Sequence, residues 1–477
     1  MKKLDYLILA ILVTLALLAR LYKIDTPLAD LHSFRQVDTA AVARNYVRSG
    51  INLMRPVYDD QSNIQTGFEN PQGLRFVEFP LYNALIALFA RYVPVVTLEI
   101  WGRLISVGFS LITLAILYYF ALKEKNRTAA VATGLVYGLF PFIVFFSRVV
   151  LPETTAIAHM MIGILLVYHG VKKGKNHTLL LTLGGVFVAL SILIKPTTIF
   201  YGITVLYLFI SAYKFDIFKT WRFYYVAALC LIPFVLWRGY ITQFPEGIPA
   251  SSWLFSTVHT FEGPKDILFR PAFFRWIFME RIGAGMMGMF GSAFLLMGLV
   301  SQYKKLFIPS IILSGFAFLF TFQGGNVQHE YYQTILFPAI ALATGVGIAQ
   351  FLKLPKSVAQ PFVLYPLVVV FFLFSIAFSY YKIKDYYSYP QDLPKIAELV
   401  RIFTKPTDRI VTDRLGDTTL LYLMDRKGAP AIYKELPELK EMGYNYIVTL
   451  DEEKTTKYQE EGYEVVIENE LFSLIRL

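Results

Sequence analysis

The stretch FVLYPLVVVFFLFSIAFSY, Phe362–Tyr380, contains no charged side chain and approaches the roughly 20 apolar residues that cross a lipid bilayer. Leu4–Leu21 and a series of further runs along the chain are similarly apolar. Apolar residues make up 56% of the 477 residues, whereas charged residues make up only 17%. The sequence therefore predicts an all-α polytopic membrane protein.

The apolar runs predict about 11 transmembrane helices, at residues 4–21, 100–121, 128–147, 154–170, 178–194, 197–213, 222–238, 284–301, 306–322, 333–352 and 362–380. If the N-terminus is cytoplasmic, every cytoplasmic break is short and basic, as the positive-inside rule requires. The basic residues are Lys2, Lys3, Lys123, Lys125, Arg127, Lys172, Lys173, Lys175, Lys214, Lys219, Arg222, Lys304, Lys305, Lys353 and Lys356. We therefore expect a multi-pass protein of the plasma or inner membrane whose loops 22–99, 239–283 and 323–332 face outward.

The formal net charge of +10 does not indicate nucleic acid, because the Lys and Arg residues lie at span ends rather than on one soluble face. We therefore expect membrane lipids and no nucleic acid as partners. The one cysteine, Cys230, lies within an apolar run. A single cysteine excludes a disulfide framework or a thiolate metal site within one chain.

After Tyr380 the composition changes, since Asp, Glu and Lys become frequent. Short helical and strand patterns alternate there, which is typical of a small α/β domain. The expected helices are Leu393–Phe403 and Thr418–Met424, and the expected strands are Arg409–Thr412, Ala431–Tyr433, Tyr446–Leu450, Tyr463–Ile467 and Leu471–Leu477. The sequence thus predicts a transmembrane catalytic domain at residues 1–380 and an extracytoplasmic α/β domain at residues 381–477.

The first outer loop, residues 22–99, is rich in carboxylates and carries two expected interfacial helices. Val37–Val47 has helical spacing of its apolar residues, and Asp38 near its start can either cap it or act chemically. Phe79–Val96 is apolar but broken by Pro80, Arg91 and Pro94, so we interpret it as interfacial rather than as a further span. Asp59 and Asp60 are interpreted as solvated loop residues.

Three ordered motifs carry a resemblance to a known superfamily. They are Asp30–Tyr46 (DLHSFRQVDTAAVARNY), Glu78-Phe79-Pro80-Leu81-Tyr82 and Leu151-Pro152-Glu153. Over about residues 1–350 the chain resembles the GT-C glycosyltransferases, and within them the protein-mannosyltransferase and aminoarabinose-transferase branch. The resemblance implies transfer of a sugar, with inversion, from a polyprenyl-phosphate donor to a glycolipid, glycan or protein acceptor on the outer face. It implies no cofactor besides that donor.

The family's expected base is an aspartate of the first loop, but Arg35-Gln36 stands where relatives often show Asp-Glu. Asp38 or Asp30 must then serve, and Asp38 is favoured. Glu153 is either a second carboxylate of the site or the cap of the fourth span. Glu78 resembles the family's Glu before a Lys-Pro pair, although Phe79 replaces the lysine. The expected contacts to donor phosphate are Arg35, Arg148, His329, Tyr332 and Lys195.

Arg148 and Lys195 also have a structural reading, as side chains that reach from span ends to the interface. His329 with Glu78 or Glu330 could hold a divalent ion, but the spacing carries no ligand signature, so no metal ligand is assigned and metal dependence stays open. The alternative functions are another lipid-linked glycan polymerase or ligase, a transporter, or a structural or receptor-like protein. A transporter would be expected to carry ionisable residues at midspan, whereas here they lie at the outer rim.

Overall fold

The computed structural model describes residues 1–171, 177–251, 254, 257–258, 265–267 and 270–477, so Lys172, Lys173 and Lys175 lie outside the described residues. The chain forms two compact units. The helical unit comprises Met1–Ile24, Arg103–Trp237 and Ser251–Asp385. The mixed unit comprises Asp25–Gly102, Arg238–Ala250 and Tyr386–Leu477. The first loop thus belongs to the same unit as the C-terminal segment, while the functional division at residue 380 stays a prediction.

Every expected span coincides with one helix or with consecutive helices. They are α1 (Lys3–Arg20), α4 (Leu98–Glu124), α5 (Arg127–Leu139), α6 (Pro141–Phe146), α7 (Glu153–Gly170), α8 (Thr178–Ile194), η1 (Pro196–Tyr201), α9 (Gly202–Tyr213), α10 (Trp221–Ile241), η4 (Arg275–Met286), α13 (Gly291–Leu299), α14 (Phe307–Thr321), η5 (Glu330–Leu336), α16 (Phe337–Phe351) and α17 (Pro361–Ile383). Proline begins α6 and η1, since its ring interrupts the preceding helix.

Within the described residues, five helical stretches are long and apolar enough to cross a membrane. They are Leu98–Glu124, Pro196–Lys219, Trp221–Ile241, Glu330–Phe351 and Pro361–Phe403. The mostly helical fold is therefore confirmed, whereas the number of eleven spans stays a prediction.

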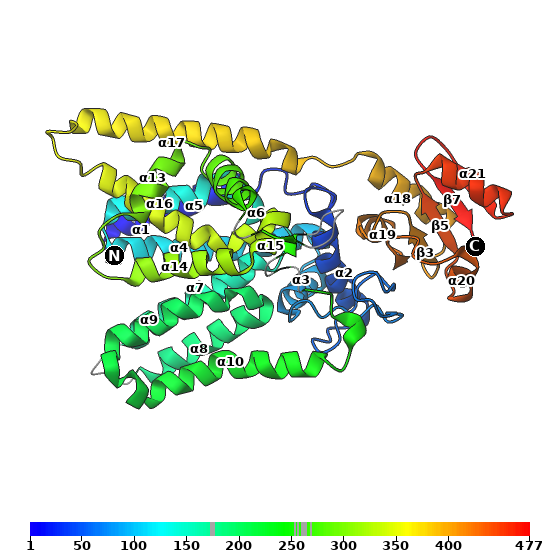
Figure 1. Cartoon of the computed structure of the whole chain (residues 1–477), viewed down its shortest axis with the longest axis horizontal. Helices are drawn as coiled ribbons and strands as arrows, with labels where there is room; N and C mark the ends of the chain where they lie inside the picture. Colours follow the sequence, from blue (N-terminus) through cyan, green and yellow to red (C-terminus); the bar gives the residue numbers. More distant parts are fainter. Residues whose placement is uncertain (172–176, 252–253, 255–256, 259–264, 268–269) are drawn as a thin grey trace. The chain divides into compact units, whose positions relative to one another are not determined.

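The antiparallel helices α7 and α8 pack closely against each other (Figure 1). A Cβ atom added at Gly163 of α7 would lie 3.0 Å from the carbonyl oxygen of Gly184 in α8. Glycine at this crossing lets the two backbones approach, as small residues commonly do between membrane helices. Because α7 begins at Glu153 and α8 ends at Ile194, the close pairing brings Glu153 and Lys195 to the same end of the helix pair.

The C-terminal segment folds around a five-stranded sheet of order β4-β3-β5-β7-β6. The strands are β3 (Arg409–Thr412), β4 (Lys427–Ala429), β5 (Tyr446–Thr449), β6 (Glu464–Glu468) and β7 (Ser473–Arg476). β3 runs parallel to β4 and β5, whereas β7 is antiparallel to β5 and β6. The predicted small sheet with helices is therefore present.

Helices cover both faces of this sheet (Figure 1). α18 (Asp392–Phe403) and α19 (Thr419–Met424) pack against Ile410, Val448 and Leu474 on one face. α20 (Leu436–Glu441) and α21 (Glu452–Glu460), which were not predicted, share the opposite core with Val411, Ile447 and Ile475.

The strand predicted near Ala431–Tyr433 is wrong, because β4 lies earlier, at Lys427–Ala429. Its central residue is Gly428, a residue type that strand patterns disfavour. A Cβ atom there would lie 1.7 Å from the carbonyl oxygen of Ile410, so only glycine fits against β3. A close backbone approach therefore outweighs the low strand propensity of glycine.

In the first loop, α2 (Ser33–Ser49) and α3 (Leu81–Tyr92) pack against each other, and α19 also packs against α2. α2 begins five residues before Asp38, so the reading of Asp38 as a helix cap is wrong. The loop also attaches to the sheet edge. The Gly428 N–H donates to the Asp59 carbonyl (2.9 Å), and the Gln61 N–H donates to the Gly428 carbonyl (2.7 Å). These bonds pair an otherwise open strand edge.

Candidate functional site

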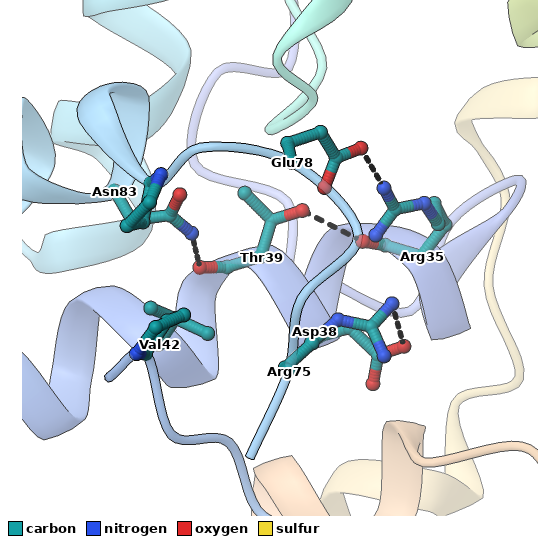
Figure 2. A pocket seen from close by; sticks show the side chains of 9 residues that line it. Arg35, Asp38, Thr39, Val42, Arg75, Glu78 and Asn83 are labelled. Carbon is teal, nitrogen blue, oxygen red and sulfur yellow. Dashed lines mark hydrogen bonds and ion pairs between the residues drawn. The ribbon is translucent and has the colours of Figure 1, made fainter. Parts of the chain in front are cut away.

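A pocket in the mixed unit gathers charged residues from α2 and from the segment that leads to α3 (Figure 2). α2 supplies Arg35, Asp38 and Thr39, and the segment before α3 supplies Arg75 and Glu78. The lining is completed by Val42, Pro56, Pro80 and Asn83. The structure thus brings together three of the predicted site residues, Arg35, Asp38 and Glu78.

Asp38 is held from two sides at this pocket. Its Oδ2 atom lies 2.8 Å from a guanidinium nitrogen of Arg75, and its Oδ1 atom accepts a hydrogen bond of 2.6 Å from the Thr418 hydroxyl. The Asp38 side chain is only 2% exposed, and the Arg75 guanidinium also lies over the Tyr58 ring at 4.6 Å. A carboxylate oxygen carries two lone pairs, so each Asp38 oxygen retains acceptor capacity.

Arg35 and Glu78 form an ion pair across the same pocket (Figure 2). Two further hydrogen bonds join residues that line the pocket. The Thr39 hydroxyl donates to the Arg35 carbonyl at 3.0 Å, and the Asn83 amide donates to the Thr39 carbonyl at 2.7 Å. Phe79 stands at the position where the resemblance led us to expect lysine, but Arg35 and Arg75 bring positive charge to the pocket. Sequence reasoning missed Arg75 and Thr418, since neither belongs to a recognisable motif.

Asp30 has a different environment from Asp38. Its Oδ1 atom accepts a hydrogen bond of 2.6 Å from the Gln36 side chain, and the residue is only 2% exposed. Asp30 is not among the described residues that line the pocket. Of the two aspartates predicted as the base, Asp38 therefore lines this pocket and Asp30 does not.

A second group of predicted residues meets inside the helical unit. The Lys195 ammonium lies 2.6 Å from Glu153 Oε1, and both side chains are buried, with 7% and 1% exposed. The ammonium also lies 5.2 Å from the centre of the Tyr332 ring. Tyr332 stacks on Tyr331 at 4.8 Å and lies 6.4 Å from the His329 ring. The arrangement is a buried ion pair beside a stack of three rings, in which the ring faces attract the cation.

Arg148 and Glu330 have partners of their own in the helical unit. The fully buried Arg148 donates a hydrogen bond of 2.7 Å to the Lys23 carbonyl and lies over the Phe145 ring. Glu330 forms an ion pair with Arg281. In the structure Glu330 thus has a cationic partner, and metal dependence, which the sequence left open, stays open. Among the described residues, no group of three or more His, Cys, Asp or Glu could hold one.

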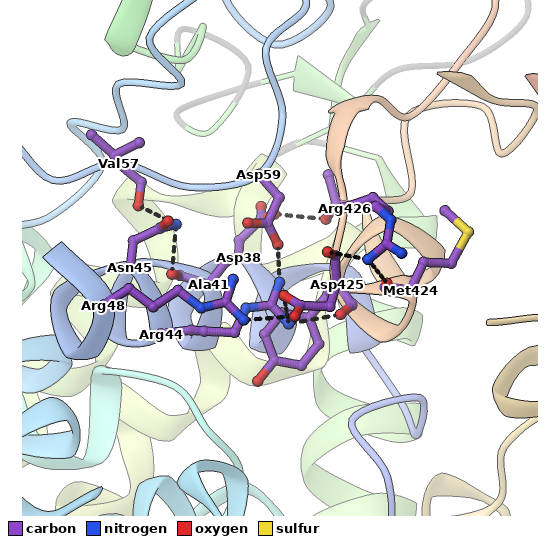
Figure 3. Close-up of polar contacts among 12 residues, drawn as sticks. Asp38, Ala41, Arg44, Asn45, Arg48, Val57, Asp59, Met424, Asp425 and Arg426 are labelled. Atoms are coloured by element: carbon purple, nitrogen blue, oxygen red, sulfur yellow. Dashed lines mark hydrogen bonds and ion pairs between the residues drawn. The ribbon is translucent and has the colours of Figure 1, made fainter. Parts of the chain in front are cut away.

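The interpretation of Asp59 and Asp60 as solvated residues is wrong, since they are only 4% and 0% exposed. Arg44 on α2 contacts Asp59 at 2.6 Å and Asp425 at 3.2 Å (Figure 3). Its guanidinium also lies 4.1 Å from the centre of the Tyr422 ring. Burial raises the pKa of Asp59, and the neighbouring Arg44 opposes that shift. These contacts join the first loop to α19 and the residue after it.

Asp60 is a buried carboxylate whose protonation should affect stability. Burial raises its pKa from 3.8 to about 6, although hydrogen bonds from the Ser62 hydroxyl and N–H, both to Oδ1, oppose the shift. Between about pH 4 and pH 6 the folded state therefore binds a proton that the unfolded state has lost, and stability falls as the pH rises through this window.

Asp60→Asn should remove this pH dependence, because its amide oxygen still accepts both bonds from Ser62. We expect the variant and the wild type to have similar unfolding free energies near pH 4, and the variant to be more stable by about 2 to 3 kcal/mol near pH 7. Thermal unfolding of both proteins across this range measures the difference. A difference that does not change with pH would show that Asp60 does not titrate in this window.

Comparisons with known proteins agree with this architecture. Residues 78–237 match the family model described as dolichyl-phosphate-mannose-protein mannosyltransferase. No curated protein matches the chain in sequence. Several solved structures are similar in fold at low sequence identity, among them the following three.

The first structure is ArnT from Cupriavidus metallidurans bound to undecaprenyl phosphate, with a TM-score of 0.67 and 13% identity over 98% of this chain and 97% of that one. The second is ArnT from the same organism in the apo state, with a TM-score of 0.68 and 12% identity over 99% of this chain and 97% of that one. The third is the oligosaccharyltransferase AglB from Archaeoglobus fulgidus, in complex with an inhibitory peptide and a dolichol-phosphate. Its TM-score is 0.59 and its sequence identity 11%, over 96% of this chain and 70% of that one. The predicted resemblance to the GT-C superfamily is thereby confirmed at the level of the fold.

Proposed function

We propose that this chain is an integral-membrane glycosyltransferase that transfers a sugar from a polyprenyl-phosphate donor to an acceptor on the outer face of the membrane. The observation that carries the proposal is Asp38, a carboxylate bordering a pocket that also contains two arginines. The ArnT fold, seen in a structure with undecaprenyl phosphate, supports the class of donor. The matched family segment begins at Glu78, within that pocket.

The proposed reaction is a single displacement with inversion at the anomeric carbon. The acceptor hydroxyl attacks that carbon while its proton passes to the Asp38 carboxylate. The bond between the carbon and the phosphate oxygen breaks, and polyprenyl phosphate departs with the bonding electron pair. A base at the acceptor and cations at the leaving phosphate each lower the barrier to such a transfer.

Positive side chains of both units are candidates for binding phosphate. Arg35 and Arg75 line the pocket of the mixed unit, and the Lys195 ammonium lies against Tyr332 within the helical unit. Lys195 is paired with Glu153, whose Oε2 atom has no hydrogen-bond partner among the described residues. Glu153 therefore retains acceptor capacity beside Lys195.

The second candidate is a glycan ligase or polymerase that uses a lipid-linked donor. The fold of AglB, an oligosaccharyltransferase, favours it as the alternative. Both functions release a lipid phosphate, but a ligase transfers a preassembled oligosaccharide. Comparing donors that carry one sugar with donors that carry several distinguishes the two.

The test of the proposed function is release of free polyprenyl phosphate. Purified protein in lipid nanodiscs is incubated with a polyprenyl-phosphate sugar and a candidate acceptor, and the freed lipid phosphate is quantified by mass spectrometry. We expect release that depends on the acceptor. A chain that is folded and binds the donor, yet releases no lipid phosphate with any sugar or acceptor class, would contradict the proposal.

The proposed topology places the C-terminal segment outside the cell. Lys457→Cys in a Cys230→Ser background introduces one thiol at a side chain that is 68% exposed. We expect an impermeant maleimide to label it in intact cells, with Cys230→Ser alone as the unlabelled control. Labelling only after lysis would overturn the proposed orientation.

A further inference from the structure

The C-terminal segment reaches the candidate base directly. Thr418 lies 380 positions after Asp38, and its hydroxyl donates the hydrogen bond of 2.6 Å to Asp38 Oδ1. Thr418 is 2% exposed, so this bond is shielded from water. Hydrogen bonds to a charged acceptor contribute more than those between neutral groups.

Two further contacts lie beside Thr418, both made by its neighbour Thr419. On its own helix, the Thr419 N–H donates to Asp417 Oδ1 at 2.8 Å, which fixes the turn that enters α19. Towards α2, the Thr419 and Ser33 hydroxyls lie 2.8 Å apart. Neither contact involves the Thr418 hydroxyl, which besides Asp38 lies 3.4 Å from one further acceptor, the Phe34 carbonyl oxygen on α2.

The far end of α19 is anchored as well (Figure 3). The Tyr422 carbonyl accepts a hydrogen bond of 2.8 Å from Arg44, and the Tyr422 hydroxyl donates to Glu99 at 2.6 Å. Asp425, just after α19, pairs with Arg48 at 2.6 Å. α19 is therefore tied to α2 along its whole length.

We propose that Thr418 is a positioning residue for sugar transfer, in that the C-terminal segment aims the Asp38 carboxylate at the acceptor hydroxyl. This inference rests on the proposed function. Arg75 fixes Oδ2 and Thr418 fixes Oδ1, so together they set the plane of the carboxylate. Thr418 keeps its own proton, and the acceptor proton moves to Asp38. A base held in a fixed orientation needs less rearrangement to reach the transition state.

The test compares three variants in the full chain. Thr418→Val keeps the shape and removes the hydroxyl, whereas Thr418→Ser keeps the hydroxyl. Thr419→Val is the matched control, because it removes the neighbouring hydrogen bond between α19 and α2 without touching Asp38. The rate constant for release of polyprenyl phosphate, the KM for the donor and the unfolding temperature are measured for each.

We expect Thr418→Val to lower kcat roughly 10- to 100-fold with an unchanged donor KM, since it loses one hydrogen bond to a charged group. Thr418→Ser should restore kcat. Thr419→Val should lower the unfolding temperature about as much as Thr418→Val and leave kcat near that of the wild type. Equal losses of kcat in both valine variants, or a serine variant as slow as Thr418→Val, would overturn the positioning role.

The outcomes separate this inference from the proposed function. If the wild type releases polyprenyl phosphate and Asp38→Asn does not, an unaffected Thr418→Val contradicts the inference alone. If Asp38→Asn is as active as the wild type, the role of Asp38 and the inference both fail. A wild type without any release contradicts the proposed function and, with it, the positioning role.

Discussion

Asp38→Asn is expected to lower the rate constant of sugar transfer by roughly 10²- to 10⁴-fold, which is the usual contribution of a positioned general base. The amide retains an oxygen that can accept the Thr418 hydrogen bond, but it cannot take the acceptor proton. Release of polyprenyl phosphate under saturating donor measures the effect. Near-normal turnover would contradict the assignment and move it to Asp30, whose variant Asp30→Asn is otherwise expected to remain active.

The loss of the Asp38 charge also leaves Arg75 without its anionic partner, so stability must be measured beside activity. Asp59→Asn is the matched control, because it removes one of the two carboxylates that pair with Arg44 in the same unit. Both variants should have lowered unfolding temperatures, since each loses the ion pair of a buried carboxylate, although Arg44 keeps Asp425 as a partner. Only Asp38→Asn should lose transfer. A parallel loss of transfer in Asp59→Asn would indicate that the effect of Asp38→Asn arises from weakened folding.

Lys195→Met is expected to lower the free energy of unfolding by about 3 to 5 kcal/mol, because Glu153 would remain as a buried carboxylate without its cation. Glu153→Gln combined with Lys195→Met removes both charges and should recover most of this loss. Denaturation of the wild type, both single variants and the double variant in one detergent gives the coupling energy. A double variant as unstable as Lys195→Met would show that packing of the lysine stem, rather than the ion pair, stabilises this end of α7 and α8.

The same set of variants tests donor binding. If Lys195 binds the donor phosphate as proposed, the double variant should recover stability but not donor affinity. Binding of a short-chain polyprenyl phosphate measures this difference. Full recovery of donor affinity in the double variant would give Lys195 a purely structural role.

The helices were predictable from sequence wherever composition alone decides the structure. An uncharged run such as Phe362–Tyr380 has little alternative to a helix in an apolar environment, and α17 covers it. β3 was likewise predictable, because Ile410 and Val411 are typical strand residues. β4 was not predictable, because glycine is required at position 428 only by the close approach of the Ile410 carbonyl on the neighbouring strand.

The candidate site was only partly predictable, for a related physical reason. Arg35, Asp38 and Glu78 lie in short motifs, and the structure brings them to one pocket. The partners of Asp38 had no local signal, because Arg75 and Thr418 reach it through the tertiary fold. The burial of Asp60 was missed for the same reason, as its backbone pairs with Gly428 of β4, which is distant in sequence. The start of α2 was missed because His32, which precedes it, has a left-handed backbone and offers no side-chain cap.

The attachment of the first loop to β4 has a consequence for biosynthesis. Asp60 leaves the ribosome long before Gly428, and at about 5 to 20 residues per second the interval between them is roughly 20 to 70 s. During this time α2 and its charged side chains lack the strand and helix that later cover them. Pairing over so long a sequence separation is intrinsically slow. The nascent first loop therefore stays without its C-terminal partners until almost the whole chain has been synthesised.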